Sequence, residues 1–247
     1  MYTNSRYDTI LSYLRQHKRA TIPELCALVY VSEATMRRDL SDMQKLGLLS
    51  RTRGGAMYIE KTEEVAISVR QNTNTQDKEL TVSIALAHLP DCETIFVDNS
   101  STCLALVRQM DLRHKVVVTN SFRIADALLE KGQVRIVMPG GEFRNNMDLA
   151  GSMTCNSLRN FRFDLMLSSC AAISLDGTFE NSLPVRELKA AAMDVSARRI
   201  LLADQTKFQL KSPYRVAPLR DYDEIFTNTP DDLLKPYLEA SLPIRNS

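Results

Sequence analysis

Polar side chains suited to binding an anion follow two of the short apolar runs in this chain. The run Ile95–Val97 leads directly into acidic and hydroxyl residues, and the run that ends at Val118 leads into a hydroxyl and an amide. The side chains concerned are Asp98, Ser100, Ser101, Thr102, Thr119 and Asn120. Hydroxyls and backbone N–H groups that open a helix bind phosphate or carboxylate groups. These segments therefore predict a ligand site, with an ordinary helix cap as the alternative.

Glycines and lysines farther along the chain extend this set. Gly140 and Gly141 follow an apolar run, where glycine either lets the backbone approach a ligand or forms a turn with positive φ. Lys189 lies in a helical pattern, and Asp204 and Lys207 follow another apolar run. Either lysine could bind a phosphate as a point charge or be a solvated surface residue. The glycines do not form G-x-G-x-x-G, so no dinucleotide cofactor is predicted.

A different group of polar residues, Ser32–Leu40, lies near the N-terminus. Its apolar positions Met36 and Leu40 are four residues apart, as on the buried face of a helix, and Arg37 and Arg38 stand between them. A helix that enters the major groove of DNA needs small or polar residues at its start and arginines that reach phosphates or guanine edges. This segment therefore predicts the reading helix of a helix-turn-helix, although Arg37 could simply pair with Glu33.

The reading helix needs neighbouring elements to hold it. A first helix is expected from Ser5 to His17, and a second after Thr21, which can cap it while Glu24 completes a capping box. Ser32 is expected to cap the third helix and Gly47 to end it. The segments 48–51 and 54–57 are expected to form the strands of a small wing around Thr52 and Arg53.

The remainder of the chain alternates short β-branched runs with helical stretches. Strands are expected at Thr94–Val97, Lys115–Val118, Val134–Met138, Leu165–Ser169, Arg199–Ala203 and Glu224–Thr227. Helices are expected at Thr102–Met110, Ser121–Glu130, Leu149–Phe161 and Arg186–Ala197. This alternation predicts an α/β fold with a mainly parallel sheet, which binds ligands at the carboxyl ends of its strands. The expected domains are 1–58, a DNA-binding winged helix-turn-helix, and 77–247, an α/β sensing and oligomerisation domain, joined by a linker at 59–76.

Charge is distributed unevenly along the 247 residues. Residues 1–58 contain nine Lys and Arg against five Asp and Glu, a net charge of +4, whereas the remaining 22 basic and 25 acidic residues give −3. Only the first part is therefore expected to meet a polyanion. No apolar run is long enough to span a membrane, no signal peptide is evident, and the five scattered cysteines form no metal or disulfide pattern. We expect a cytoplasmic protein without a metal or a membrane partner.

These motifs together resemble the DeoR family of bacterial sugar-catabolism repressors. In the first part the resemblance rests on Arg6, Ile10 and Leu14, on Ser32 with Thr35 to Leu40, and on Gly47, Leu49, Arg51 and Gly54 to Ala56. Arg53 stands where the family usually has histidine. The resemblance implies that DNA is contacted by residues of the second and third helices and of the wing. These are Thr21, Ser32, Glu33, Ala34, Thr35, Arg37, Arg38, Arg51 and Arg53.

The resemblance continues more loosely to about Pro230. It implies a sensor domain that shares its fold with ribose-5-phosphate isomerases, and a phosphorylated sugar as the effector that releases a DNA operator. It also implies a homo-dimer or homo-tetramer. Lys189 matches a family lysine, and Asp204 to Phe208 resembles the family's Asp-x-Ser-Lys-Phe. Asn99, Ser100 and Ser168 to Ala172 depart from the family pattern, which leaves the identity of the ligand open.

Two other functions remain open at this stage. An aldose–ketose phosphate isomerase would need a carboxylate base, for which Asp98, Asp176 and Glu187 are candidates. The aspartate-rich loop of such isomerases has no clear counterpart here, and a shared fold alone does not decide activity. A DNA-binding regulator whose second domain only oligomerises is the other alternative. The polar and glycine-rich strand ends argue against it.

Overall fold

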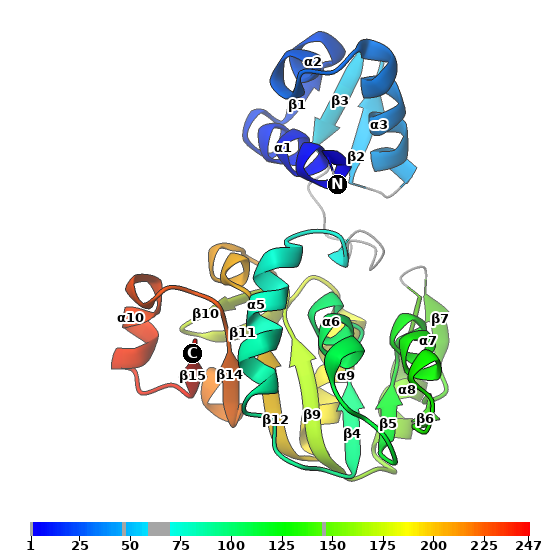
Figure 1. Cartoon of the computed structure of the whole chain (residues 1–247), viewed down its shortest axis with the longest axis vertical. Coiled ribbons are helices and arrows are strands. Elements are labelled where there is room, and N and C mark those ends of the chain that lie inside the picture. Colours follow the sequence, from blue (N-terminus) through cyan, green and yellow to red (C-terminus); the bar gives the residue numbers. More distant parts are fainter. Residues whose placement is uncertain (1, 46–47, 59–69, 145–146) are drawn as a thin grey trace. The chain divides into compact units, whose positions relative to one another are not determined.

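The computed structural model describes residues 2–45, 48–58, 70–144 and 147–247. It divides into two compact units, Met1–Thr73 and Asn74–Ser247 (Figure 1). The first is a small helical unit with a three-stranded sheet, and the second is an α/β unit. No helix within the described ranges is both long and apolar enough to cross a membrane.

Three helices build the first unit: α1 (Tyr2–His17), α2 (Ile22–Val29) and α3 (Glu33–Lys45). α1 begins three residues before the expected Ser5. The capping box of α2 is confirmed, because the Thr21 side chain accepts from the Glu24 backbone and the Glu24 carboxylate accepts from Thr21. Such a box satisfies two N–H groups that the helix leaves without partners. It fixes the start of α2, whereas the turn into α3 follows the C-cap at Tyr30, whose N–H donates to the Cys26 carbonyl.

α3 is held by a buried apolar face and one ion pair. Met36, Leu40 and Met43 are fully buried in the core of the first unit, as expected from their spacing. The Arg6 guanidinium of α1 donates to both carboxylate oxygens of Asp39, at 2.7 and 3.1 Å. Because Asp39 is buried, this fork anchors the inner side of α3 to α1 and leaves the opposite side exposed.

The wing contains one more strand than the sequence predicts. The expected hairpin is formed by β2 (Leu49–Thr52) and β3 (Gly55–Tyr58), and β1 (Arg19–Thr21) pairs with β3 on its other side. A three-residue strand is too short to show an alternating pattern. A Cβ at Gly55 would lie 2.1 Å from the Ala20 carbonyl oxygen, so only glycine fits this pairing. Gly47, the expected end of α3, is outside the described residues.

A seven-stranded parallel sheet forms the centre of the second unit, which confirms the predicted α/β fold class. In spatial order its strands are β15 (Ile244–Arg245), β14 (Glu224–Phe226), β12 (Ser196–Leu202), β9 (Phe163–Ser169), β4 (Thr94–Val97), β5 (Val116–Thr119) and β6 (Arg135–Val137). The chain runs outward from β4 to β6 and then returns to place β9 beside β4. Such a reversal opens a crevice between the carboxyl ends of the two strands.

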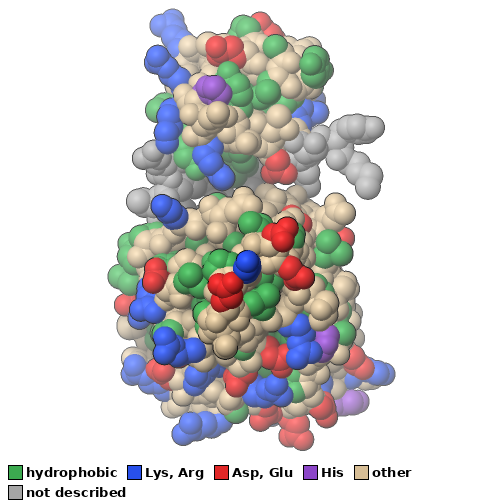
Figure 2. Space-filling model, turned by 90° about the vertical axis from the view of Figure 1, so that its left-hand side faces the viewer, with side chains coloured by type: hydrophobic (Ala, Val, Ile, Leu, Met, Phe, Trp, Pro, Cys, Tyr) green, Lys and Arg blue, Asp and Glu red, His purple; other side chains and the backbone are tan. Residues whose placement is uncertain are grey.

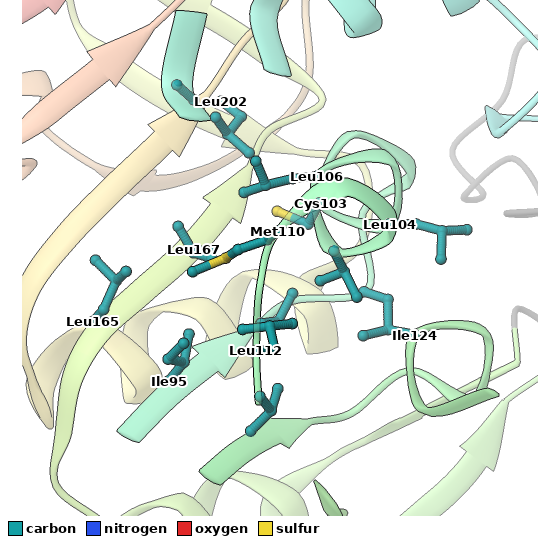
Figure 3. Packing of buried hydrophobic residues seen from close by; sticks show 14 of the residues in the cluster. Ile95, Cys103, Leu104, Leu106, Met110, Leu112, Ile124, Leu165, Leu167 and Leu202 are labelled. Carbon is teal, nitrogen blue, oxygen red and sulfur yellow. The ribbon is translucent and has the colours of Figure 1, made fainter. Parts of the chain in front are cut away.

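Helices cover both faces of this sheet, which is why its strands are continuously apolar. They are α5 (Thr75–Leu86), α6 (Ser101–Gln109), α7 (Phe122–Lys131), α8 (Ser152–Leu158), α9 (Leu183–Asp194) and α10 (Asp231–Glu239). Figure 1 shows α5, α6 and α7 on one face and α9 on the other. Alternate residues of β4 separate the two cores. Ile95 packs in the cluster that contains Cys103 and Leu106 of α6 (Figure 3). Phe96 packs in the other cluster, with Leu188 and Ala192 of α9.

The expected helix Leu149–Phe161 is wrong in its first part. That stretch contributes to a hairpin of β7 (Glu142–Arg144) and β8 (Asp148–Ala150), and α8 begins only after Gly151. Gly151 adopts φ 94°, a conformation that side chains disfavour and that separates strand from helix. A small sheet of β10 (Ala172–Ser174), β11 (Gly177–Glu180) and β13 (Tyr214–Ala217) was likewise not predicted.

We predict that replacing Asp39 by Ala lowers the free energy of unfolding of the first unit by about 2–3 kcal/mol, because Arg6 loses a largely buried partner. The matched control is Glu33→Ala, which breaks the exposed 3.1 Å pair with Arg37. That change should lower the free energy of unfolding by less than about 1 kcal/mol. Calorimetric unfolding of the full chain measures both, and equal effects would contradict an anchoring role for Asp39.

Candidate functional site

One candidate site is the outward side of α3 and the turn before it. Ser32, Glu33, Ala34, Arg37 and Arg38 are exposed, and Thr35 is half-buried. The Ser32 hydroxyl caps the helix by accepting from the Thr35 backbone at 3.3 Å, and the two hydroxyls lie 3.0 Å apart. Ser32, Ala34 and Thr35 are small, so the start of α3 can approach the floor of a groove closely on their side.

The two arginines of α3 differ in their surroundings. Arg37 donates to the Glu33 carboxylate one turn earlier at 3.1 Å, the local pair that the spacing left open. Within the described part of the chain, Arg38 forms no hydrogen bond or ion pair and is exposed. Arg38 is therefore the arginine of this helix that is available to an external partner without first breaking an internal contact.

The other residues with a predicted DNA contact surround this helix. Thr21 is exposed, but its hydroxyl donates to Glu24 at 2.8 Å within the capping box. Arg51 and Arg53 are exposed at the hairpin between β2 and β3, and the Arg51 backbone donates to the Gln44 side chain of α3 at 3.3 Å. The wing is thereby tied to the reading helix. Figure 2 shows Lys and Arg side chains gathered along one side of this unit.

A second candidate site lies where the strand order reverses, between the ends of β4 and β9. One oxygen of the fully buried Asp98 carboxylate accepts from the Ser168 hydroxyl at 2.9 Å and from the Ser169 backbone at 3.0 Å. The other accepts from the Ser100 backbone at 2.9 Å. The Lys189 ammonium of α9 lies 2.9 Å from Asp98. Asp98 therefore joins the two strands rather than standing free in the crevice.

Lys189 is almost fully buried and faces three acceptors. Besides Asp98 it donates to the Ser169 carbonyl at 2.6 Å and to the Glu180 carboxylate of β11. An ammonium has three N–H donors, so these contacts saturate it. Burial opposes the charged form, but Asp98 and Glu180 outweigh it and raise the pKa of Lys189. The predicted phosphate contact of Lys189 remains a prediction, and this arrangement favours a positioning role.

The same network sets the charge of Asp98. Burial by itself would raise the pKa of the carboxyl, but the Lys189 charge and the hydrogen bonds from Ser100, Lys189 and Ser169 lower it to about 2. Nearby, burial raises the pKa of the Cys170 thiol to about 12. A carboxylate with so low a pKa is a weak base, and both Asp98 oxygens already accept hydrogen bonds from the protein, which together weigh against Asp98 as a general base.

A third group of polar residues lies at the end of β5, beside the β7–β8 hairpin. The Thr119 hydroxyl accepts from the Ser121 backbone at 3.2 Å, and Asn120 exchanges hydrogen bonds with the Leu149 backbone. The Asn99 amide donates to the buried Asp148 carboxylate, which links the end of β4 to the same hairpin. All of these side chains lie at the edge of the sheet where β4 ends and α6 begins, with Ser100 as the cap and Ser101 and Thr102 as the first helical residues.

Several residues of this edge were missed by sequence reasoning. They are Asn99 as a contact, Ser121, Arg144, Asp148, Thr154, Ser168, Ser169, Glu180 and Ser182. Arg144 of the hairpin donates to the Ser182 hydroxyl at the start of α9, at 3.2 Å. No strand was expected between Met138 and Leu149, so Arg144 and Asp148 could not be assigned to a strand end.

The predicted glycines differ in what they do. Gly140 is exposed and has open space around it, with Met153 at 3.7 Å from a hypothetical Cβ. At Gly141, a Cβ would lie 1.9 Å from the Thr154 hydroxyl oxygen, and φ is 153°. Gly141 is therefore required by the close approach of α8, whereas Gly140 is free to face a ligand.

Asp204 and Lys207 lie at the end of β12, two strands away from β4. The Asp204 carboxylate is fully buried and caps a short 3₁₀ helix (Gln205–Gln209), accepting from the Thr206 backbone at 3.1 Å. Lys207 is half-buried on that turn. Neighbouring strands are about 5 Å apart, so the predicted ligand residues extend over about 14 Å from β12 to β5.

Some buried oxygen atoms along this edge have no hydrogen-bond partner among the described residues. They belong to Asn120 (Oδ1), Thr154 (Oγ1) and Asp204 (Oδ2). Buried acceptors without donors are costly, by about 1–3 kcal/mol each, and are usually satisfied by water or a ligand. They therefore indicate positions where hydroxyl or amine groups would be stabilised.

A winged helix-turn-helix joined to an α/β unit of this kind defines a transcriptional regulator that binds DNA. Residues 73–229 match the DeoR C terminal sensor domain, and residues 6–62 match the DeoR-like helix-turn-helix domain. The chain belongs to the DeoR family, as its motifs predict.

Two relatives extend along nearly the whole chain. The HTH-type transcriptional repressor GlcR of Bacillus subtilis is 30% identical over 234 residues, which are 92% of this chain and 89% of that protein. The glycerol-3-phosphate regulon repressor of Escherichia coli is 27% identical over 236 residues, 93% of this chain and 92% of its own length. Among solved structures, ribose 5-phosphate isomerase A from Methanocaldococcus jannaschii gives a TM-score of 0.40 at 12% identity, covering 55% of each chain.

We predict that the second unit loses stability as the pH falls from about 4 toward 2. The pKa of Asp98 is about 2 in the folded protein and about 4 when unfolded, so the ionised form stabilises the fold above the unfolded value and is lost on acidification. The contribution is on the order of 2 kcal/mol. Urea unfolding across this pH range measures it.

Asp98→Asn should lower stability at neutral pH and flatten this acid dependence, because the titrating carboxyl is gone. The exposed Asp176→Asn is the matched control and should reproduce the profile of the unmodified chain. If both variants show that unmodified profile, the Asp98–Lys189 pair is not the acid-sensitive contact.

Proposed function

We propose that this protein is a cytoplasmic repressor of a carbohydrate-catabolism operon. It binds a double-stranded operator through α3 and the wing. When a phosphorylated sugar binds at the carboxyl ends of the parallel strands, the protein releases the operator. The observation that carries the DNA half is the orientation of α3, whose buried face leaves its small N-terminal residues and Arg38 exposed on the opposite side.

DNA recognition divides among these residues by chemistry. Ala34 and the start of α3 are small enough to approach base edges, and Arg38 can reach a guanine edge with two donors. Arg37, Arg51 and Arg53 supply phosphate contacts that position the helix without reading sequence. The helix N-terminus of α3 adds a favourable site for a phosphate near Ser32. In this scheme Asp39, which is buried against Arg6, stays away from the polyanion, whereas the exposed Glu33 remains among the proposed contacts beside Ser32 and Ala34.

The sensing half rests on the polar strand ends around the reversal point. The start of α6, with Ser100, Ser101 and Thr102, offers hydroxyls and N–H groups to a phosphate. The oxygens of Asn120 and Thr154 that have no partner among the described residues suit the hydroxyl groups of a sugar. A related regulator is named for glycerol-3-phosphate, a phosphorylated polyol. Asp98 and Lys189 hold the two sides of this site together.

Coupling between the two sites follows from oligomerisation. Two copies joined through their second units would present two reading helices, which bind half-sites about 34 Å apart on DNA. A ligand that closes the strand ends would change the spacing or orientation of the two heads. Such coupling changes affinity by a free energy of about 1–3 kcal/mol.

Replacing Arg38 by Ala should weaken binding to an operator by about 1–3 kcal/mol, because a base or phosphate contact is lost. The operator is the tightest duplex that the unmodified protein selects from a random-sequence library, and fluorescence anisotropy measures the affinity. Arg135→Ala, an exposed arginine of the second unit, is the control and should bind normally. Undiminished affinity of Arg38→Ala would mean that α3 is not the reading helix.

A phosphorylated sugar should raise the melting temperature of the second unit, whereas the parent sugar should not. At 100 times its Kd a ligand adds about 2.7 kcal/mol, or about 5–10 °C for a unit of this size. A thermal-shift panel of phosphosugars and parent sugars on the full chain measures this. A panel in which no phosphorylated compound shifts the transition would argue for a second unit that does not sense phosphosugars.

A further inference from the structure

Tyr30 stands in the turn between α2 and α3 and contacts almost nothing in the protein. It is 93% exposed, the largest exposure among the large apolar side chains of the described residues. Ile22 and Leu25 of α2 and Met36 of α3 are buried in the core on either side of this turn. Tyr30 does not join this core. The tyrosine ring is instead directed into solvent beside the start of the reading helix.

The backbone at Tyr30 is also unfavourable for this residue type. As the C-cap of α2 it adopts φ 53° and ψ 50°, the left-handed conformation that glycine and asparagine occupy at little cost. Its N–H still donates to the Cys26 carbonyl, which ends the helix in the usual way. A tyrosine here is therefore not stabilised by burial, and its left-handed backbone conformation lowers the stability of the folded protein. Such a combination is expected where a side chain serves binding rather than folding.

The neighbours of Tyr30 indicate what it meets. In a helix-turn-helix the first helix crosses the DNA backbone and the N-terminus of the second enters the groove, so the turn between them lies beside the phosphates at the groove edge. Ser32 and Ala34, which follow Tyr30, are small, so they let the start of α3 approach the floor of the groove. Tyrosine hydroxyls are among the groups that donate to DNA phosphates.

We propose that Tyr30 is a further DNA-contact residue, whose hydroxyl donates to a phosphate oxygen at the edge of the major groove. This rests on the proposed DNA-binding function of α3. The contact fixes the depth of α3 in the groove and does not depend on the base sequence. Because a phenol is neutral, the contact releases no counterion from the DNA.

Tyr30→Phe keeps the ring and the fold and removes only the hydroxyl. In the full chain it should lower affinity by about 10-fold, or about 1.4 kcal/mol, both for the selected duplex and for a random-sequence duplex. The slope of log affinity against log salt should stay unchanged. Arg53→Ala, a predicted charged phosphate contact, should instead reduce that slope by about 1. Tyr214→Phe, the same change at an exposed tyrosine of the second unit, is the control.

Tyr30→Asn provides a second, independent readout. Asparagine tolerates the left-handed conformation, so this variant should raise the melting temperature of the first unit while it lowers DNA affinity. A Tyr30→Phe variant that binds both duplexes as tightly as the unmodified protein would overturn the proposal. A loss confined to the selected duplex would overturn the phosphate assignment in favour of base contact. If the unmodified protein binds no duplex at all, the proposed function itself fails.

Discussion

The Lys189 ammonium is the group on which the second unit depends. It is buried, and it binds Asp98 at the end of β4, the Ser169 carbonyl at the end of β9 and Glu180 on β11. An ammonium in the protein interior is stable only when its donors are all paired, and a carboxylate in the interior only when its charge is balanced. The two strands that flank the reversal point and the small sheet beyond them are therefore held at fixed positions by one charge. Removing Lys189 would leave the Asp98 and Glu180 carboxylates uncompensated in the interior.

This fixed centre explains how one edge of the sheet can be both rigid and polar. Asp98 and Lys189 use nearly all of their hydrogen-bonding capacity on each other, on Ser168 and Glu180, and on the backbone, which favours a positioning role over their predicted ligand contacts. Near the same edge, the amide oxygen of Asn120 and the hydroxyl of Thr154 have no hydrogen-bond partner among the described residues, and Ser101 and Thr102 begin α6 after the Ser100 cap. In the proposed function these groups are the ones that meet the ligand, and Asp98 and Lys189 hold them in place.

The first unit follows the same division with fewer residues. Arg6 and Asp39 form the buried pair that fixes α3, and the arginines without such a role, above all Arg38, stay exposed. In both units an ion pair with a buried carboxylate sets the position of elements beside the proposed binding residues. Tyr30 differs from this pattern, because it contributes to neither core and occupies a backbone conformation that disfavours it.

The sequence by itself determined the elements with strong local signals. The capping box at Thr21, the buried spacing of Met36, Leu40 and Met43, and the apolar runs of the parallel strands all have local physical causes, and the family resemblance followed from the same residues. Only the tertiary structure decided the pairing of β1, the β7–β8 hairpin and the small sheet around β11, because three-residue strands depend on distant partners. It also decided that Lys189 is buried against Asp98 and Glu180. Those residues are 91 and 9 positions away in the chain, and no local pattern records which charges a fold brings together.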